Sequence, residues 1–81
     1  MKLPRDISGE QLASRLNKYK YCVTRQTGSH LRLDSDYKGT IHHVTIPRHD
    51  PLRVGTLNSI LNDIAAYLEI DKQKLIDNLW D

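Results

Sequence analysis

GSHLRLDSDYKGTIHHVTIP, residues 28–47, is the stretch of sequence that decides the fold. It contains two runs of alternating apolar and polar residues, separated by turn-forming residues, which is the pattern of a β-hairpin. The first run predicts a strand over about residues 30–34, and the second predicts one over about 40–46. Pro47 ends the second strand because proline has no backbone N–H with which to continue the pairing.

The first strand separates an apolar face from a polar one. Side chains alternate across a strand, so Leu31 and Leu33 lie on one face and His30 and Arg32 on the other. The leucines are expected to fill the core. A histidine and an arginine therefore share the face that does not.

The second strand repeats this division. Val44 is expected to point inward together with His42, whereas His43 and Thr45 point outward. Side chains of hairpin partners lie within roughly 5–8 Å of each other on one face. We therefore expect His43 to lie close to His30.

The hairpin is preceded by a helix and a further strand. Ser8 and Gln11 form the Ser-x-x-Gln pattern of a capping box, which predicts a helix over about residues 9–19. The β-rich composition of residues 21–25 predicts a strand in which Val23 is one of the core-facing residues.

Two helices are expected after the hairpin. Apolar residues at positions i, i+3, i+4 and i+7 predict a helix over about residues 57–67, with Thr56 as its N-cap. Asp71 is the expected cap of a short last helix. The apolar stripe of the longer helix consists of Leu57, Ile60, Leu61 and Ile64.

These elements predict an α+β fold of the order α-β-β-β-α, with a short C-terminal helix added. The three strands form an antiparallel sheet, and the amphipathic helices cover its apolar face. This is the arrangement of the double-stranded-RNA-binding fold, and it leaves the other sheet face open. A length of 81 residues predicts a single domain over residues 1–81.

Composition narrows the class of protein further. Residues 1–53 carry ten Lys or Arg against five Asp or Glu, whereas residues 54–81 carry two Lys against five acids. A basic half favours a polyanionic partner such as a nucleic acid. The single cysteine, Cys22, forms neither an internal disulfide nor a zinc site. With no apolar run long enough for a membrane helix and no visible signal peptide, we expect a cytoplasmic protein without a membrane partner.

The open face suggests a chemistry. Histidine titrates near neutral pH and can carry a proton, and arginine can bind a phosphate through two hydrogen bonds. His30 and Arg32 are therefore suited to a phosphodiester. In RNA the 2′-hydroxyl is a built-in nucleophile, so such a site needs a proton carrier but no cofactor and no metal.

The other polar residues have alternative interpretations. His42 lies on the apolar face and is interpreted as a packed histidine, and His43 is either solvated or a second acid or base. His49 follows the last strand and either contacts phosphate or has no function. Ser29 lacks the G-x-S-x-G context of a nucleophile and is interpreted as a turn residue. The four histidines show neither helical metal-ligand spacing nor a cysteine partner, which argues against a metal site.

Four segments together resemble one known family. They are LPRDISG at residues 3–9, RQTGSH at 25–30, HVTIPRH at 43–49 and GTLNSIL at 55–61. In this order they resemble the HicA toxin (YcfA-like) family. The resemblance implies a double-stranded-RNA-binding-like fold and a metal-independent ribonuclease that cleaves mRNA and halts translation. It also implies a HicB-type antitoxin that binds and neutralises the toxin.

The resemblance also implies roles for individual residues. The family's catalytic histidine follows Gly-Ser and falls on His30, with Gly28 in the positioning turn. We expect a monomer when free and a hetero-oligomer with the antitoxin. Two other functions stay open, a non-catalytic double-stranded-RNA-binding module and a pure protein-interaction domain. The candidate RNA- or phosphate-binding residues are Ser29, Arg32, His43, Arg48 and His49.

Overall fold

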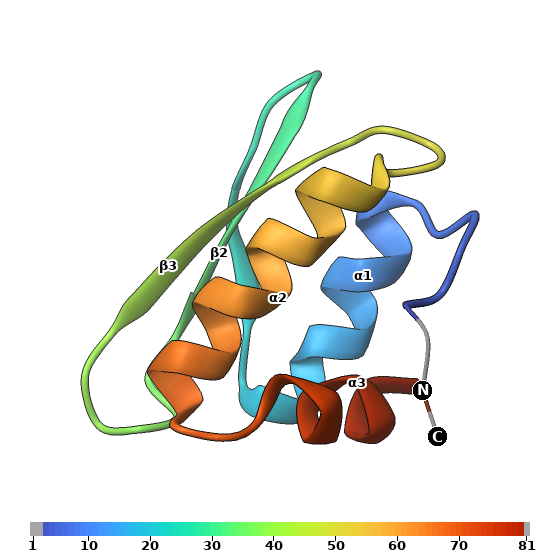
Figure 1. Ribbon diagram of the computed structural model, residues 1–81. Coiled ribbons are helices and arrows are strands. Elements are labelled where there is room, and N and C mark those ends of the chain that lie inside the picture. Colours follow the sequence, from blue (N-terminus) through green and yellow to red (C-terminus); the bar gives the residue numbers. More distant parts are fainter. Residues whose placement is uncertain (1–2, 81) are drawn as a thin grey trace.

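The computed structural model describes residues 3–80, and its elements follow in the predicted order (Figure 1). The predicted α-β-β-β-α arrangement with an added C-terminal helix is therefore confirmed. The elements are α1 (Gly9–Arg15), a 3-10 helix η1 (Leu16–Tyr19), β1 (Cys22–Gln26), β2 (His30–Ser35), β3 (His42–Pro47), α2 (Val54–Leu68) and α3 (Lys72–Trp80).

The sheet is antiparallel, and β2 lies between β1 and β3. Leu31 pairs with Ile46 and Leu33 with Val44, so the predicted apolar residues of the two strands share one face. The register of this face is fixed because a slip by one residue would expose all of them to solvent.

The helices α1 and α2 lie on the apolar face of the sheet, and α3 crosses at one end of them (Figure 1). The core between these layers includes Leu12 and Leu16 from the first helical segment, together with the predicted stripe of α2. On the opposite face, the side chains of His30 and Arg32 are exposed, as the alternation predicts. The fold therefore presents a polar sheet face on which a ligand can be bound.

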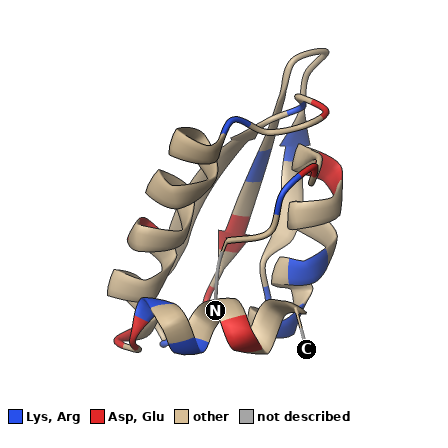
Figure 2. Cartoon of the chain, turned by 45° about the vertical axis from the view of Figure 1, so that its right-hand side comes forward, with Lys and Arg blue, Asp and Glu red and all other residues tan. Residues whose placement is uncertain are grey.

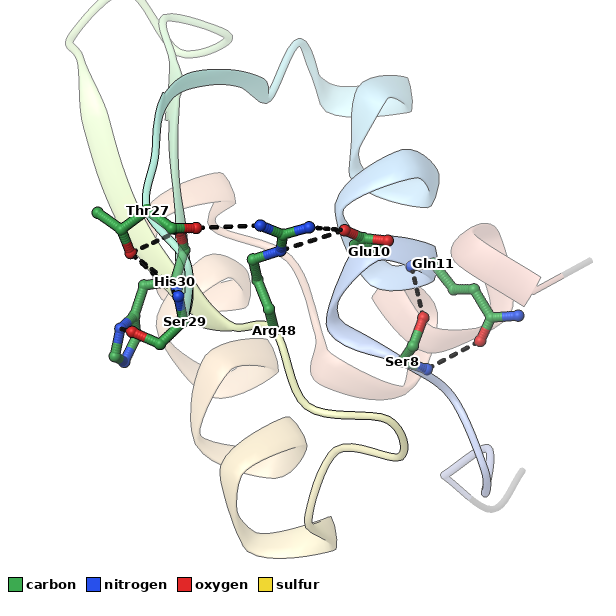
Figure 3. Close-up of polar contacts among 7 residues, drawn as sticks. All are labelled: Ser8, Glu10, Gln11, Thr27, Ser29, His30 and Arg48. Carbon is green, nitrogen blue, oxygen red and sulfur yellow. Dashed lines mark hydrogen bonds and ion pairs between the residues drawn. The ribbon is translucent and has the colours of Figure 1, made fainter.

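The start of α1 is fixed by a capping box and by a close contact with the end of β3. The Gln11 N–H donates to Ser8 Oγ at 3.1 Å, and the Ser8 N–H donates to Gln11 Oε1 at 2.8 Å, which confirms the predicted cap (Figure 3). A Cβ atom on Gly9 would lie only 2.0 Å from the carbonyl oxygen of Pro47. Glycine is therefore what allows this helix end to pack against the strand.

Two details of the sequence-based expectation are wrong. The helix α2 begins at Val54 with Arg53 as its N-cap, so Thr56 lies in the first turn instead of capping it. Val23 is 47% exposed rather than in the core. A β-bulge interrupts β1 after Val23, and the helices pack mainly over β2 and β3, which leaves this edge strand uncovered.

His42 is packed, as predicted from its place on the apolar face. Its Nδ1 lies 2.6 Å from the Tyr21 hydroxyl, and its ring stacks on Tyr67 with a centroid distance of 4.6 Å. Its Nε2 lies 3.5 Å from a carboxylate oxygen of Asp63. Burial raises the pKa of the Tyr21 hydroxyl, which keeps its proton available for donation to the imidazole. Both nitrogens of His42 are thus engaged inside the fold.

The last helix is held by cations from the first helical segment. Arg15 donates from Nη1 to the carbonyl oxygen of Leu79 at 2.9 Å, and Lys18 donates to that of Asn78. Positive charge at a helix C-terminus interacts favourably with the helix dipole. Within residues 3–80, none of the helices is long and apolar enough to cross a membrane.

Candidate functional site

His30 begins β2 directly after a turn that Thr27 organises. The Thr27 hydroxyl oxygen accepts hydrogen bonds from the N–H of His30 at 3.0 Å and from that of Ser29 at 3.3 Å (Figure 3). The Thr27 N–H in turn donates to the carbonyl oxygen of His30 at 2.9 Å. Sequence reasoning missed Thr27, although a threonine hydroxyl that bonds the backbone two or three residues ahead is a recognised turn motif.

Gly28 does not need the conformational freedom that its place in the turn suggests. The described glycine with positive φ is Gly39, at 91° in the hairpin loop, and a Cβ atom on Gly28 would meet nothing within 4 Å. The turn at Gly28 therefore does not use the left-handed backbone conformation that glycine tolerates. The chain's own packing leaves the space beside Gly28 open.

The imidazole of His30 is oriented by its neighbour. Ser29 Oγ lies 2.8 Å from His30 Nδ1, and both side chains are on the exposed side of the turn (Figure 3). This contact occupies Nδ1 and leaves Nε2 without a hydrogen-bond partner among the described residues. An imidazole held in this way presents one nitrogen to a ligand, as a general acid or base requires.

Arg48 ties this turn to the first helix. Its Nη1 donates to the carbonyl oxygen of Thr27 at 3.0 Å, and its Nη2 and Nε donate to Glu10 Oε1 at 2.7 Å and 3.2 Å (Figure 3). Its backbone N–H donates to the carbonyl oxygen of Ser29 at 2.8 Å. These contacts give Arg48 a structural role in holding the residues that precede His30.

Replacing Arg48 tests this role. Arg48→Ala is expected to lower the free energy of unfolding by about 1–2 kcal/mol, because a partly exposed, charge-assisted hydrogen-bond network is lost. Urea denaturation monitored by circular dichroism measures the change. Glu10→Gln is the matched variant, because it keeps an acceptor oxygen for Arg48. It should lower the free energy of unfolding less than Arg48→Ala does. Equal stability of Arg48→Ala and the wild type would contradict the role.

His30 lines a hollow between the sheet and α2. The hollow has a volume of about 470 Å³, within the size range of ligand sites. Its lining residues come from β2, β3 and the first half of α2, and Figure 1 shows β3 running alongside this helix. Its wall combines an imidazole with hydroxyl groups, and the lining residues are His30, Thr45, Pro47, Gly55, Thr56, Ser59 and Ile60.

The strand register separates His43 from His30. His30 pairs with Pro47, whereas His43 pairs with Asp34, four residues farther along β2. The expectation that His43 lies beside His30 is therefore wrong. The alternation correctly predicts the shared face, but the register depends on how the hairpin loop and the two strands pack.

The comparison with known proteins agrees with this geometry. A family model described as "HicA toxin of bacterial toxin-antitoxin" matches residues 9–65, which is more than half of the chain. The chain belongs to the HicA toxin family. Searches of curated proteins and of solved structures gave no significant match.

The family match covers all of the candidate site. In this HicA-family toxin, the turn at Gly28, the imidazole of His30 and the α2 wall of the hollow fall within the matched residues. The helix α3 lies outside them. The predicted family membership is confirmed, and membership makes the chain the toxin of a toxin–antitoxin pair.

Arg32 and His49 do not line the hollow, although Arg32 pairs across the strands with Thr45, which does. Arg32 is half-exposed, and its Nε lies 3.6 Å from Asp34 Oδ1. His49 is exposed in the loop after β3, and its carbonyl oxygen accepts a hydrogen bond from the Gly9 N–H at 3.0 Å. Within residues 3–80, no group of three or more His, Cys, Asp or Glu side chains is arranged to hold a metal ion.

Proposed function

We propose that this HicA-family toxin is an endoribonuclease that cleaves mRNA and uses His30 as a proton carrier. The observation that supports this most strongly is the orientation and exposure of the His30 imidazole. Ser29 occupies Nδ1, and the side chain is exposed at the wall of the hollow between the edge of the sheet and α2. A phosphodiester that enters this hollow would meet Nε2.

The proposed reaction uses the nucleophile of the substrate. A base removes the proton of the ribose 2′-hydroxyl, and the 2′-oxygen forms a bond to the adjacent phosphorus. The bond from phosphorus to the 5′-oxygen of the next nucleotide breaks, and an acid protonates that oxygen. His30 Nε2 takes one of these two roles. The products are a 2′,3′-cyclic phosphate and a 5′-hydroxyl, and the reaction needs neither cofactor nor metal.

The other candidate residues have supporting roles in this proposal. Ser29 orients the imidazole, and Gly28 leaves room beside the turn. Arg32 is exposed on the polar face of the sheet and His49 is exposed in the loop after β3, and both can contact the phosphates of the RNA. A HicB-type antitoxin is the proposed partner that neutralises the toxin in the cytoplasm.

A chemically defined substrate tests the proposal. We expect the purified protein to cleave an RNA oligonucleotide and to leave 2′,3′-cyclic phosphate ends. A single 2′-deoxy substitution on the 5′ side of the cleaved bond should abolish cleavage at that bond, because it removes the nucleophile. The same RNA without the substitution is the control, and EDTA should not change its rate. Cleavage of the 2′-deoxy position, or loss of activity with EDTA, would contradict the mechanism.

The main alternative is a module that binds double-stranded RNA without cleaving it. It would bind RNA with a steep salt dependence and leave it intact. One observation disfavours it. The helix α2 carries no Lys or Arg, and its single charged residue is Asp63 (Figure 2). This helix therefore offers an RNA backbone hydroxyl groups but no fixed positive charge.

A further inference from the structure

The hollow at His30 continues into a second one along the same edge of the sheet. Both hollows are lined by Thr45, Ser59 and Ile60, so they form one groove between β3 and α2. His30 lines one end of this β3–α2 groove, and His43 lines the other. An extended chain lying in the groove would pass both imidazoles.

His43 is oriented as firmly as His30 is. Its Nδ1 lies 2.6 Å from Asp34 Oδ1, which leaves Nε2 as the nitrogen available to a ligand. The hydrogen bond from His43 is the main cause that lowers the pKa of the Asp34 carboxyl, so this carboxylate stays charged beside the ring. Asp34 Oδ1 also lies 3.6 Å from Arg32 Nε, so the carboxylate that orients the His43 ring is itself held from a second side.

The strand register sets the backbones of the two histidines apart. Four residues along a strand span roughly 13 Å. A general acid or base must lie within about 3 Å of the proton that it moves. With their backbones this far apart, we expect the two rings to contact different phosphates.

The charges along the groove indicate what His43 could bind. Among the lining residues, His30 and His43 alone can carry a positive charge. The wall shared by the two hollows carries the hydroxyl groups of Thr45 and Ser59 beside the apolar side chain of Ile60. The two hydroxyl groups can donate hydrogen bonds to the oxygens of an RNA backbone. Asp63 lines the same end of the groove as His43, and its carboxylate limits how many phosphates can bind there.

We propose that His43, held by Asp34, binds a second phosphate of the RNA strand whose scissile phosphate lies at His30. This inference rests on the proposed ribonuclease function and adds a binding subsite to it. RNA would lie lengthwise in the β3–α2 groove, with His30 and His43 contacting different phosphates. His43 would then determine how much RNA beyond the cut the toxin requires.

Phosphate neutralisation tests the subsite. A His30→Ala protein keeps RNA intact, so its affinity can be measured for oligonucleotides that each carry one uncharged methylphosphonate linkage. We expect that neutralising one particular linkage, at some distance from the cleaved bond, weakens binding about three- to tenfold. In a His30→Ala/His43→Ala protein this linkage should cause no further loss, because its partner has been removed. His43→Gln, which keeps a polar side chain without the charge, should behave in the same way.

Lys38→Ala provides the matched control. Lys38 is an exposed cation in the hairpin loop and does not line the groove. Its removal should leave the loss at the sensitive linkage unchanged. If the affinity loss at every linkage is the same with and without His43, while the wild type cleaves RNA through His30, the subsite is wrong and the proposed function stands. A groove that binds a protein segment instead of RNA would give the same outcome. If the wild type does not cleave RNA, the proposed function itself fails.

Discussion

His30→Ala is expected to lower the rate of RNA cleavage by roughly 10²–10⁴-fold, the usual contribution of a positioned acid or base. The imidazole is exposed, and among residues 3–80 its hydrogen-bond partner is the Ser29 hydroxyl, 2.8 Å from Nδ1. The substitution should therefore leave the fold intact. Single-turnover cleavage of a labelled oligonucleotide measures the rate, and thermal unfolding verifies the fold.

Two comparisons make this result specific to proton transfer. RNA affinity of His30→Ala should fall much less than the cleavage rate, because most binding energy comes from other phosphate contacts. Asp36→Ala, in the hairpin loop at the far end of β2, should cleave at the wild-type rate, since Asp36 lines neither half of the groove. An alanine variant of His30 that cleaves RNA as fast as the wild type would exclude His30 as the catalytic residue.

Gly9→Ala is expected to cause the largest loss of stability. The added Cβ atom would lie 2.0 Å from the carbonyl oxygen of Pro47 and 3.1 Å from Cγ2 of Ile46. Backbone atoms cannot move aside as a side chain can, so the end of α1 must shift away from β3. Overpacking of this kind costs about 1–3 kcal/mol. For a domain of this size, the melting temperature should fall by about 5–20 °C.

Gly55→Ala is the matched control for stability. Gly55 also lies in the first turn of a helix, but a Cβ atom there would meet nothing within 4 Å. Alanine is the better helix former, so this variant should be as stable as the wild type or more stable by up to about 1 kcal/mol. If Gly9→Ala had the same melting temperature as Gly55→Ala, the contact between α1 and β3 would not be tight.

The polar face of the sheet is predictable from the sequence because it follows from local geometry. Alternation assigns His30 and Arg32 to one face and Leu31 and Leu33 to the other, and the structure agrees. The capping box is equally local, since Ser8 and Gln11 are three residues apart. The same reasoning fails for Val23, because alternation gives the direction of a side chain but not whether a helix covers it.

The partners of the site residues are not predictable in this way. Nothing near Arg48 in the sequence indicates that its guanidinium contacts Glu10, because α1 comes beside the end of β3 only in the folded chain. Asp34 likewise meets His43 through the strand register. Neither pair has a periodicity that a sequence pattern could reveal.

By itself, the sequence determined the order of the elements, the faces of the strands, the capped start of the first helix and membership in the HicA toxin family. These depend on residues close together in the chain or on motifs read directly from it. The tertiary structure alone decided that His43 pairs with Asp34 rather than lying beside His30, and that α2 forms a groove with β3. Register and helix placement result from packing the whole core at once, so no local pattern contains them.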